Sequence, residues 1–280
     1  MGDNESTPKP VWKRLLRSLF RIFTLLFLVI FICGGGFYCW NPQKIHLHKD
    51  PVGVPTSYTG NVGAWFTKEA RVTVVVGHPD DAEYFISGVL LKMYDAGTKI
   101  TLIVVTDGDK SYYPPFLTNA EENRRVRRAE QTEASSHYGA DVVFLGGPDG
   151  RYDPEEPVLR KKLEDAMVNS KPDVIMAFDP EYIPTIQHRD HENSGRAASE
   201  LASKTSAKTI LYFASTAPNF SVATGDYWSK RSDLIAIHKS QFSGKKLDWV
   251  RSTLMEREMN DGEKFGGDMG EAFRAMQLKD

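Results

Sequence analysis

After residue 71 the chain alternates short apolar runs, rich in β-branched residues, with longer segments of helical periodicity. The strand candidates are residues 72–76, 99–106, 141–145, 173–178 and 209–213. The helix candidates are residues 82–96, 119–138, 157–169, 191–203, 230–239 and 245–259. Strands that alternate with helices of this length form parallel βαβ units. The pattern therefore predicts an α/β fold with a doubly wound, mostly parallel sheet.

An apolar stretch precedes this region. Residues 22–40 are 19 consecutive uncharged residues, close to the roughly 20 that a helix needs to cross a bilayer. Five Lys or Arg residues lie between positions 9 and 21, whereas Lys44 and Lys49 are the two that follow closely. This bias predicts a single-pass anchor with the amino terminus in the cytoplasm and the rest on the far side. A cleaved signal peptide is the alternative, but no clear small-x-small cleavage site follows.

The predicted anchor divides the chain into four parts. Residues 1–21 are a basic cytoplasmic amino terminus, 22–40 the transmembrane anchor, 41–70 a connector rich in Pro, Gly and polar residues, and 71–280 one domain. The net charge of −2 gives no argument for a nucleic-acid partner. Both cysteines lie in the apolar stretch, so the domain has no disulfide and no thiolate metal site.

Polar residues follow the first strand candidate at once. The strand ends in Gly77, and His78, Asp80 and Asp81 come next. Ligands of open α/β sheets bind beyond the carboxyl ends of strands, and imidazole and carboxylate groups serve as metal ligands and acid–base groups. Gly77 has no Cβ, which lets backbone and ligand approach closely. The alternative is a simple turn in which an Asp caps the next helix.

A second polar cluster follows the fourth strand candidate and a loop with two prolines. It contains His188, Asp190 and His191 at the start of an Ala-rich helical pattern. Core packing does not explain these residues, because their neighbours in the sequence are polar; an exposed polar loop is the alternative. Two such clusters, each at a strand–loop–helix boundary, predict that distant parts of the chain meet around one metal ion.

Several motifs resemble those of one enzyme family. His78-Pro79-Asp80-Asp81-Ala82-Glu83, with Gly88 after it, resembles the signature of the LmbE-like zinc-dependent N-acetylglucosaminyl deacetylases, relatives of GlcNAc-phosphatidylinositol de-N-acetylase. Further matches occur in order at residues 106–109, 127–139, 145–150, 188–191 and 238–241. The resemblance covers roughly residues 71–241. It implies a Rossmann-like sheet and the removal of acetyl from an N-acetylated amino sugar or glycolipid.

The resemblance also implies roles for individual residues. It makes His78, Asp81 and His191 the metal ligands. Two nitrogens and one oxygen leave a position open for water, as a catalytic zinc requires, and ferrous iron accepts the same ligands. It makes Asp80 the general base, and it makes His188 the group that stabilises the oxyanion and protonates the departing amine.

The remaining assignments concern the surroundings of the site. Asp190 is predicted to orient one imidazole, as ligand histidines usually require. Arg127 is predicted to contact a polar or anionic part of the substrate, with a solvated helix face as the alternative because it lies in a basic run. Arg189 stands where relatives often carry proline. No tyrosine directly precedes the second motif, which leaves Tyr182 as the alternative helper for the oxyanion.

Other functions stay open at this point. A metallohydrolase could act on another amide, a lactone or a different sugar. A nucleotide-binding or sensory domain would need a Gly-rich phosphate loop after the first strand, whereas here one glycine precedes acidic residues that repel phosphate. A non-catalytic metal-binding module is disfavoured by the presence of both Asp80 and His188. The sequence predicts no oligomeric state.

Overall fold

The computed structural model describes residues 43–111 and 119–278. The predicted anchor at residues 22–40 lies outside the described residues, as does the basic amino terminus. Within the described ranges, no helix is both long and apolar enough to cross a bilayer. All described residues except Gln43 belong to the second of the two units into which the chain divides, Lys44–Asp280.

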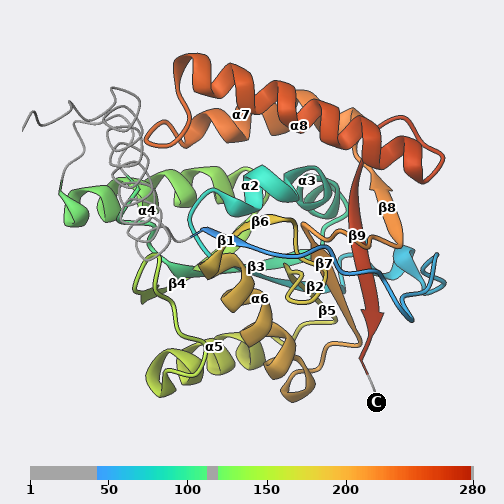
Figure 1. The fold of residues 1–280 in the computed structure, drawn as a ribbon, viewed down its shortest axis with the longest axis horizontal. Helices are drawn as coiled ribbons and strands as arrows, with labels where there is room; N and C mark the ends of the chain where they lie inside the picture. The colour runs from blue at the N-terminus through green and yellow to red at the C-terminus, as the bar shows by residue number, and fades with distance from the viewer. Residues whose placement is uncertain (1–42, 112–118, 279–280) are drawn as a thin grey trace, which may run out of the picture. The chain divides into compact units, whose positions relative to one another are not determined.

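A seven-stranded sheet forms the centre of the second unit, in the order β4-β3-β2-β5-β7-β9-β8 (Figure 1). Its parallel strands are β2 (Arg71–Val76), β3 (Lys99–Thr106), β4 (Ala140–Gly147), β5 (Val174–Phe178) and β7 (Thr209–Phe213). These are the five predicted strands. Their spatial order is that of the Rossmann fold, so the predicted α/β architecture with a mostly parallel sheet is confirmed.

Two further strands extend the sheet, and the sequence pattern does not predict them. β9 (Gly270–Gln277) runs antiparallel to β7, and β8 (Phe220–Ala223) runs antiparallel to β9. β9 carries the buried charged residues Glu271 and Arg274 among its apolar positions. These charges interrupt the apolar pattern that would identify a buried strand in the sequence.

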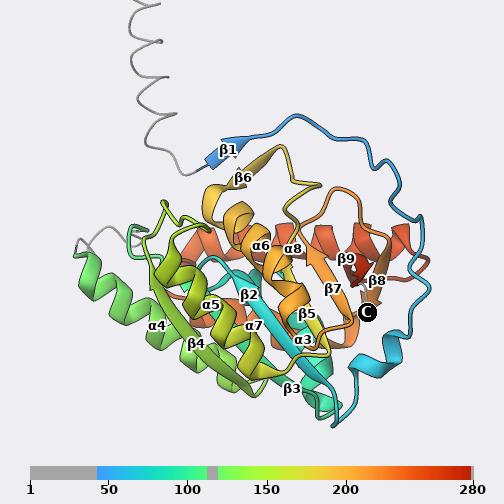
Figure 2. The ribbon, with the colours of Figure 1, turned by 90° about the horizontal axis from the view of Figure 1, so that it is seen from below.

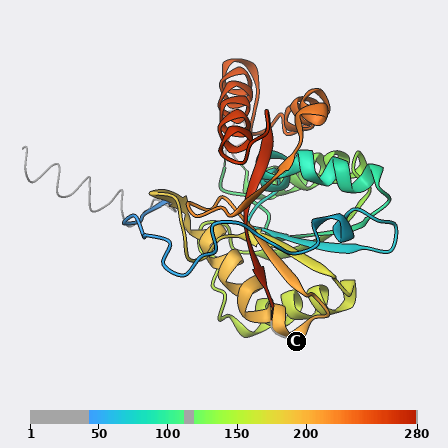
Figure 3. The same cartoon turned by 90° about the vertical axis from the view of Figure 1, so that its right-hand side faces the viewer.

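Helices cover both faces of the sheet (Figures 1 and 3). One face carries α2 (Asp81–Phe85), α3 (Ser87–Asp95), α4 (Ala120–Ser136), α7 (Trp228–Ile237) and α8 (Gly244–Lys264). The other carries α5 (Pro157–Ser170) and α6 (Arg189–Leu201). Short 3-10 helices occur at η1 (Val62–Trp65), η2 (Ala202–Lys204) and η3 (Gly225–Tyr227). The single helix predicted over residues 82–96 is broken at Ile86, whose backbone is not helical.

Alternate residues of the buried strands pack into opposite layers. Val74 belongs to the core that contains Leu90 of α3, whereas Val75 belongs to the core that contains Leu163 of α5. A strand buried on both faces needs apolar residues at successive positions. This is why the parallel strands are continuous apolar runs in the sequence.

The connector runs beside the segment that carries the second polar cluster. β1 (Gln43–Ile45) pairs with β6 (Ile186–His188) in a separate two-stranded sheet (Figure 2). His46 N donates a hydrogen bond to Thr185 O at 2.8 Å, and Lys44 pairs with Glu192 at 2.5 Å. These contacts attach the connector to the start of α6.

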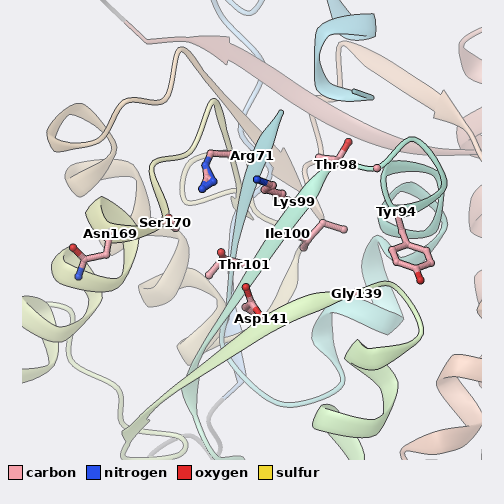
Figure 4. Close-up of a pocket in the computed structure, with 11 residues that line it drawn as sticks. Arg71, Tyr94, Thr98, Lys99, Ile100, Thr101, Gly139, Asp141, Asn169 and Ser170 are labelled. Carbon is pink, nitrogen blue, oxygen red and sulfur yellow. The ribbon is translucent and has the colours of Figure 1, made fainter. Parts of the chain in front are cut away.

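The strand order reverses between β2 and β5, which are neighbours in the sheet. Their carboxyl ends therefore mark the switch point at which open α/β sheets bind ligands. The first polar cluster follows β2, and the second follows β5. A cavity of about 370 Å³ lies at the starts of β2 and β3 instead, where Arg71 and Lys99 line it (Figure 4). It is thus at the opposite edge of the sheet from the predicted site.

Candidate metal centre and active site

The two polar clusters meet beyond the ends of β2 and β5. His78 Nδ1 lies 3.1 Å from His191 Nε2, although the residues are 113 positions apart. Asp81 Oδ2 lies 3.6 Å from His78 Nδ1, and Asp81 Oδ1 lies 3.0 Å from His191 Nε2. Ligands bound at about 2.0–2.2 Å around a tetrahedral ion are about 3.3–3.6 Å apart. At 3.0–3.6 Å the three predicted ligands lie close enough to share one metal ion, although two of the three distances are shorter than a bound ion would set.

Local packing fixes the directions of these ligands. A Cβ on Gly77 would lie 3.0 Å from His191 Cδ2 and 3.3 Å from Asp81 Oδ2, so a larger residue would crowd the centre. The His191 ring stacks on Phe178, with centroids 4.1 Å apart and planes inclined by 5°. His191 Nδ1 lies 3.0 Å from Gln187 Oε1, a hydrogen bond that directs Nε2 toward the ligand cluster.

Two carboxylates lie against the far side of His78. His78 Nε2 is 3.3 Å from Asp190 Oδ2 and 3.3 Å from Asp149 Oδ1. The structure thus places Asp190 where it can orient an imidazole, and that imidazole is His78. Asp149, on the loop after β4, has no role in the sequence-based prediction. The sequence shows the motif at residues 145–150 that contains Asp149. It does not show that this loop brings Asp149 into contact with His78.

The pKa shifts of His78 and Asp81 show how closely imidazoles and carboxylates lie at this centre. Burial lowers the pKa of His78, but hydrogen bonds to three carboxylates outweigh burial and raise it well above the usual value. Burial raises the pKa of Asp81, but the two ligand histidines outweigh it and lower that pKa. Without a metal, protons on imidazoles must balance these carboxylates. A divalent cation supplies the same balance, and this donor set suits Zn²⁺.

His188 lies within reach of the same centre. Ring nitrogens of His78, His188 and His191 lie within 4.8 Å of one another. Ring nitrogens of His78 and His188 and carboxylate oxygens of Asp149 and Asp190 form a second group with the same spacing. Asp190 N donates to His188 Nδ1 at 3.2 Å, which leaves Nε2 as the nitrogen that carries the proton. Burial and the two neighbouring imidazoles lower the pKa of His188 to about 3, so its ring is neutral here.

Asp80 has a strained backbone beside the ligands. Its φ is 101° and its ψ −20°, and Asp80, Lys171 and Ala214 are the non-glycine residues with positive φ among those described. Such conformations persist only where the surroundings enforce them, and they cluster at active sites. Asp80 N donates to Gln131 Oε1 at 2.8 Å. Burial raises the pKa of Asp80, although Arg127 opposes this.

Arg127 is buried among polar groups beside the candidate centre. It is 3% exposed, so it does not lie on a solvated helix face. Its guanidinium donates to Asp80 Oδ2 at 3.0 Å and to the carbonyl oxygens of Gly108 and Pro79. These bonds form because α4 packs on the loop after β3. Arg127 holds the Asp80 carboxylate in the structure, and its contact with substrate stays a prediction.

Two departures from the family pattern have structural explanations. Arg189 is the first residue of α6, a position that proline favours but that does not require it. The Tyr182 hydroxyl is directed at Val52 O, at 3.4 Å, and its ring packs on the Arg274 guanidinium. Tyr182 therefore does not face the ligand cluster in this structure.

Comparisons with known proteins agree with this geometry. The family model GlcNAc-PI de-N-acetylase (PIG-L) matches residues 73–202, which include both polar clusters. Residues 73–202 therefore form a PIG-L-like, or LmbE-like, domain. Among curated relatives, the probable N-acetyl-alpha-D-glucosaminyl L-malate deacetylase 2 of Bacillus anthracis is 28% identical over 210 residues, which cover 69% of this chain and 88% of the relative.

Other deacetylases resemble the PIG-L-like domain as well. Diacetylchitobiose deacetylase of Thermococcus kodakarensis is 22% identical over 198 residues, which cover 63% of this chain and 72% of the relative. The solved structure of N,N'-diacetylchitobiose deacetylase from Pyrococcus horikoshii, in complex with an inhibitor, has a TM-score of 0.69 and 26% identity. The match covers 75% of this chain and 85% of that one.

Proposed function

We propose that this chain is a metal-dependent hydrolase that removes the acetyl group from an N-acetylated amino sugar, and that residues 22–40 anchor it in a membrane. One observation carries the activity: His78, Asp81 and His191 converge within 3.0–3.6 Å beside Asp80, in a domain of the PIG-L family. The relatives named as deacetylases of an N-acetylglucosaminyl malate and of diacetylchitobiose support an N-acetylated sugar as the substrate.

The ligand set supports zinc, with ferrous iron as the second choice. When bound, such an ion lowers the pKa of a water toward about 7 and polarises a carbonyl oxygen. Asp80 is the proposed base that takes a proton from the attacking water. Arg127 fixes the Asp80 carboxylate at 3.0 Å, so that the base has one orientation.

His188 is the group that we propose acts on the acetyl oxygen. Because Nδ1 accepts a hydrogen bond from Asp190 N, the proton is on Nε2, which can donate to the oxygen as negative charge develops. The departing amine must also gain a proton. His188 is the proposed donor: its neutral ring passes the Nε2 proton to the amine nitrogen while it regains the proton that Asp80 took from water, so that neither group keeps a net change in charge.

A substrate panel tests this proposal. Full-length protein loaded with Zn²⁺ would be incubated with N-acetylglucosamine, N-acetylglucosaminyl malate, diacetylchitobiose, an N-acetylglucosaminyl glycolipid, a simple acetamide and a lactone. We expect equal release of acetate and primary amine from at least one amino sugar. Turnover of only the acetamide or the lactone would favour a different hydrolase. Tight metal binding without any product would favour a non-catalytic module.

The membrane anchor and its orientation rest on the sequence. The support is the uncharged stretch at residues 22–40 and the bias of five basic residues before it against two after it. In addition, the connector that follows exposes the apolar side chains of Ile45, Leu47 and Val52. An anchor would confine the enzyme to the surface that bears a lipid-linked substrate. We propose that the domain lies on the non-cytoplasmic side.

Carbonate extraction of membranes and protease treatment of intact cells test the two parts separately. We expect the chain to stay with the membrane after extraction and its carboxyl-terminal domain to be cleaved in intact cells. Release by carbonate would contradict the anchor. Protection of the domain until the membrane is opened would contradict the orientation.

A further inference from the structure

Four buried polar side chains behind Asp80 take no part in the chemistry proposed above. They are Glu83 of α2, Gln131 of α4, Tyr138 shortly after α4, and His238 directly after α7. None of the four is measurably exposed. Ionisable residues are rarely buried so completely unless they are paired. Their arrangement therefore indicates a specific task.

Glu83 is the centre of this group. Glu83 Oε1 accepts hydrogen bonds from the Tyr138 hydroxyl at 2.6 Å and from Gln131 Nε2 at 2.9 Å. Glu83 Oε2 lies 3.1 Å from His238 Nε2. The other ring nitrogen of His238 is buried without a partner among the described residues, so Glu83 is what holds this ring. Each carboxylate oxygen thus has a fixed donor.

Gln131 connects Glu83 to the predicted base. Because its amide nitrogen donates to Glu83, its amide oxygen must point the other way, and it accepts the hydrogen bond from Asp80 N at 2.8 Å. This bond is made to the residue whose φ is 101°. A non-glycine residue keeps such a backbone only where several contacts enforce it. Arg127 holds the Asp80 carboxylate, and Gln131 holds the Asp80 backbone.

We propose that Glu83, Gln131, Tyr138 and His238 form a positioning network that holds Asp80 in its strained conformation and so aims its carboxylate at the metal centre. The inference rests on the proposed function, in which Asp80 is the general base. His238 lies outside residues 73–202, which the family model matches. The network therefore gives a role to a carboxyl-terminal motif, residues 238–241, that the metal centre does not use.

Gln131→Met is the first test, because it removes both amide groups at similar side-chain length. We expect kcat to fall about 10- to 100-fold, since a misplacement of about 1 Å has this effect on a reacting group. KM and metal content should not change, because Gln131 contacts none of the predicted ligands. A crystal structure of the variant should show a negative φ at Asp80. An unchanged kcat, or a φ that stays near 101°, overturns the proposal.

A pair of substitutions at Glu83 separates hydrogen bonding from charge. Glu83→Gln keeps an oxygen that can accept from Tyr138 and Gln131, and an amide that can donate to a neutral His238. We expect it to keep kcat within about threefold of the wild type. Glu83→Ala should lose as much as Gln131→Met. Equal losses in the two Glu83 variants would contradict a network that acts through its hydrogen bonds.

Tyr138→Phe has a matched control in Tyr212→Phe. Both tyrosines are buried, and the Tyr212 hydroxyl lies 2.9 Å from Ser199 Oγ, in a different cluster. We expect similar small decreases in Tm for the two variants but a lower kcat only for Tyr138→Phe. A kcat that falls equally in both, or in neither, would show that Tyr138 has no positioning role.

A double-mutant cycle connects the network to the base. In an Asp80→Asn background, Gln131→Met should cause no further loss of residual turnover, because the group that it positions is absent. Loss by the same factor in both backgrounds would contradict the proposal. Full turnover of Asp80→Asn alone would instead contradict the proposed function, so that the two failures can be told apart.

Discussion

Two clusters of buried charges in this domain differ in the groups that pair with their carboxylates. At the metal centre, three carboxylates surround His78. In the second cluster, Arg231 of α7 pairs with Glu258 of α8 and with Glu271 of β9. Arg257 lies partly buried beside them and feels the charge of Arg231. Guanidinium groups thus pair directly with the carboxylates in the second cluster, whereas imidazoles and backbone N–H groups contact those around His78.

The contacts of the second cluster show that it connects elements of the fold. Glu271 accepts hydrogen bonds from Gly88 N at 2.9 Å and Val89 N at 2.8 Å, and Arg231 donates to Tyr84 O. It therefore ties β9 and the carboxyl-terminal helices to α2 and α3. Strained backbone at Asp80, together with carboxylates that contact imidazoles, distinguishes the candidate metal centre from a cluster that supports the fold.

Removal of a ligand should give the largest effect. We expect the wild-type protein to bind close to one divalent ion per chain, and His78→Ala and His191→Ala to lose both the ion and all turnover, because two ligands cannot hold it. Metal analysis by mass spectrometry and the acetate assay measure this. Arg231→Met, in the second cluster, is the control that should keep the ion. Full metal content in both histidine variants would show that the ion binds elsewhere.

Replacement of the proposed base should have the second-largest effect. Asp80→Asn tolerates the positive φ, because Asn is favoured there, but it cannot accept a proton. We expect the ion to remain and kcat to fall by about 10²- to 10⁴-fold. Steady-state kinetics with matched metal analysis checks both parts. Normal turnover would exclude Asp80 as the base.

In the second cluster we expect a loss of stability rather than of chemistry. Arg231→Met leaves Glu258 and Glu271 buried without their shared cation, which should cost about 3–5 kcal/mol of unfolding free energy. Urea unfolding measures this, and the folded fraction should keep its KM. A decrease below about 1 kcal/mol would mean that this ion pair contributes no more than an exposed one.

Glu258 should make the stability of the domain depend on pH. Burial raises its pKa to about 7 from an ordinary 4.5, although Arg231 opposes this. The folded chain therefore keeps a proton that the unfolded chain releases near pH 4.5, and this contribution is lost as the pH rises through about 7. We expect Glu258→Gln to gain stability relative to the wild type between about pH 5 and pH 8. A constant difference in Tm over this range would contradict the shift.

The smallest effect should come from relief of backbone strain. Asp80 and Lys171 both have positive φ, which glycine adopts without cost. We expect Asp80→Gly to raise the unfolding free energy by less than Lys171→Gly, for which we expect about 1 kcal/mol or less, because the first change leaves the buried Arg127 guanidinium without its carboxylate. Only the first should lose turnover. If Asp80→Gly destabilises the domain instead, its side-chain contacts outweigh the strain.

The sequence predicted correctly those elements whose burial pattern is visible within a single segment of the chain. The parallel strands are predicted correctly because each is buried on both faces and is therefore a continuous apolar run. β9 is not predicted, because Glu271 and Arg274 are buried within it and pair with residues from other elements. The predicted anchor lies outside the described residues and remains a prediction.

The candidate site also combines residues that the sequence identifies with contacts that only packing creates. His78, Asp81 and His191 are candidates in the sequence because of their residue types and their places after strands. Arg127 shows the limit of this reasoning, because the basic run around it indicates an exposed helix face. Its burial against the loop after β3 follows only from the packing of α4 on the sheet.

The sequence by itself determined the fold class and the kind of chemistry, since strand periodicity and ligand type are properties of neighbouring residues. Only the tertiary structure decided which groups meet: Asp149 and Asp190 against His78, Arg127 against Asp80, and Glu83 against His238. Each of these pairs joins residues that are far apart in the chain. Their distances are set by how helices and loops pack on the sheet, and no local pattern of residues encodes that packing.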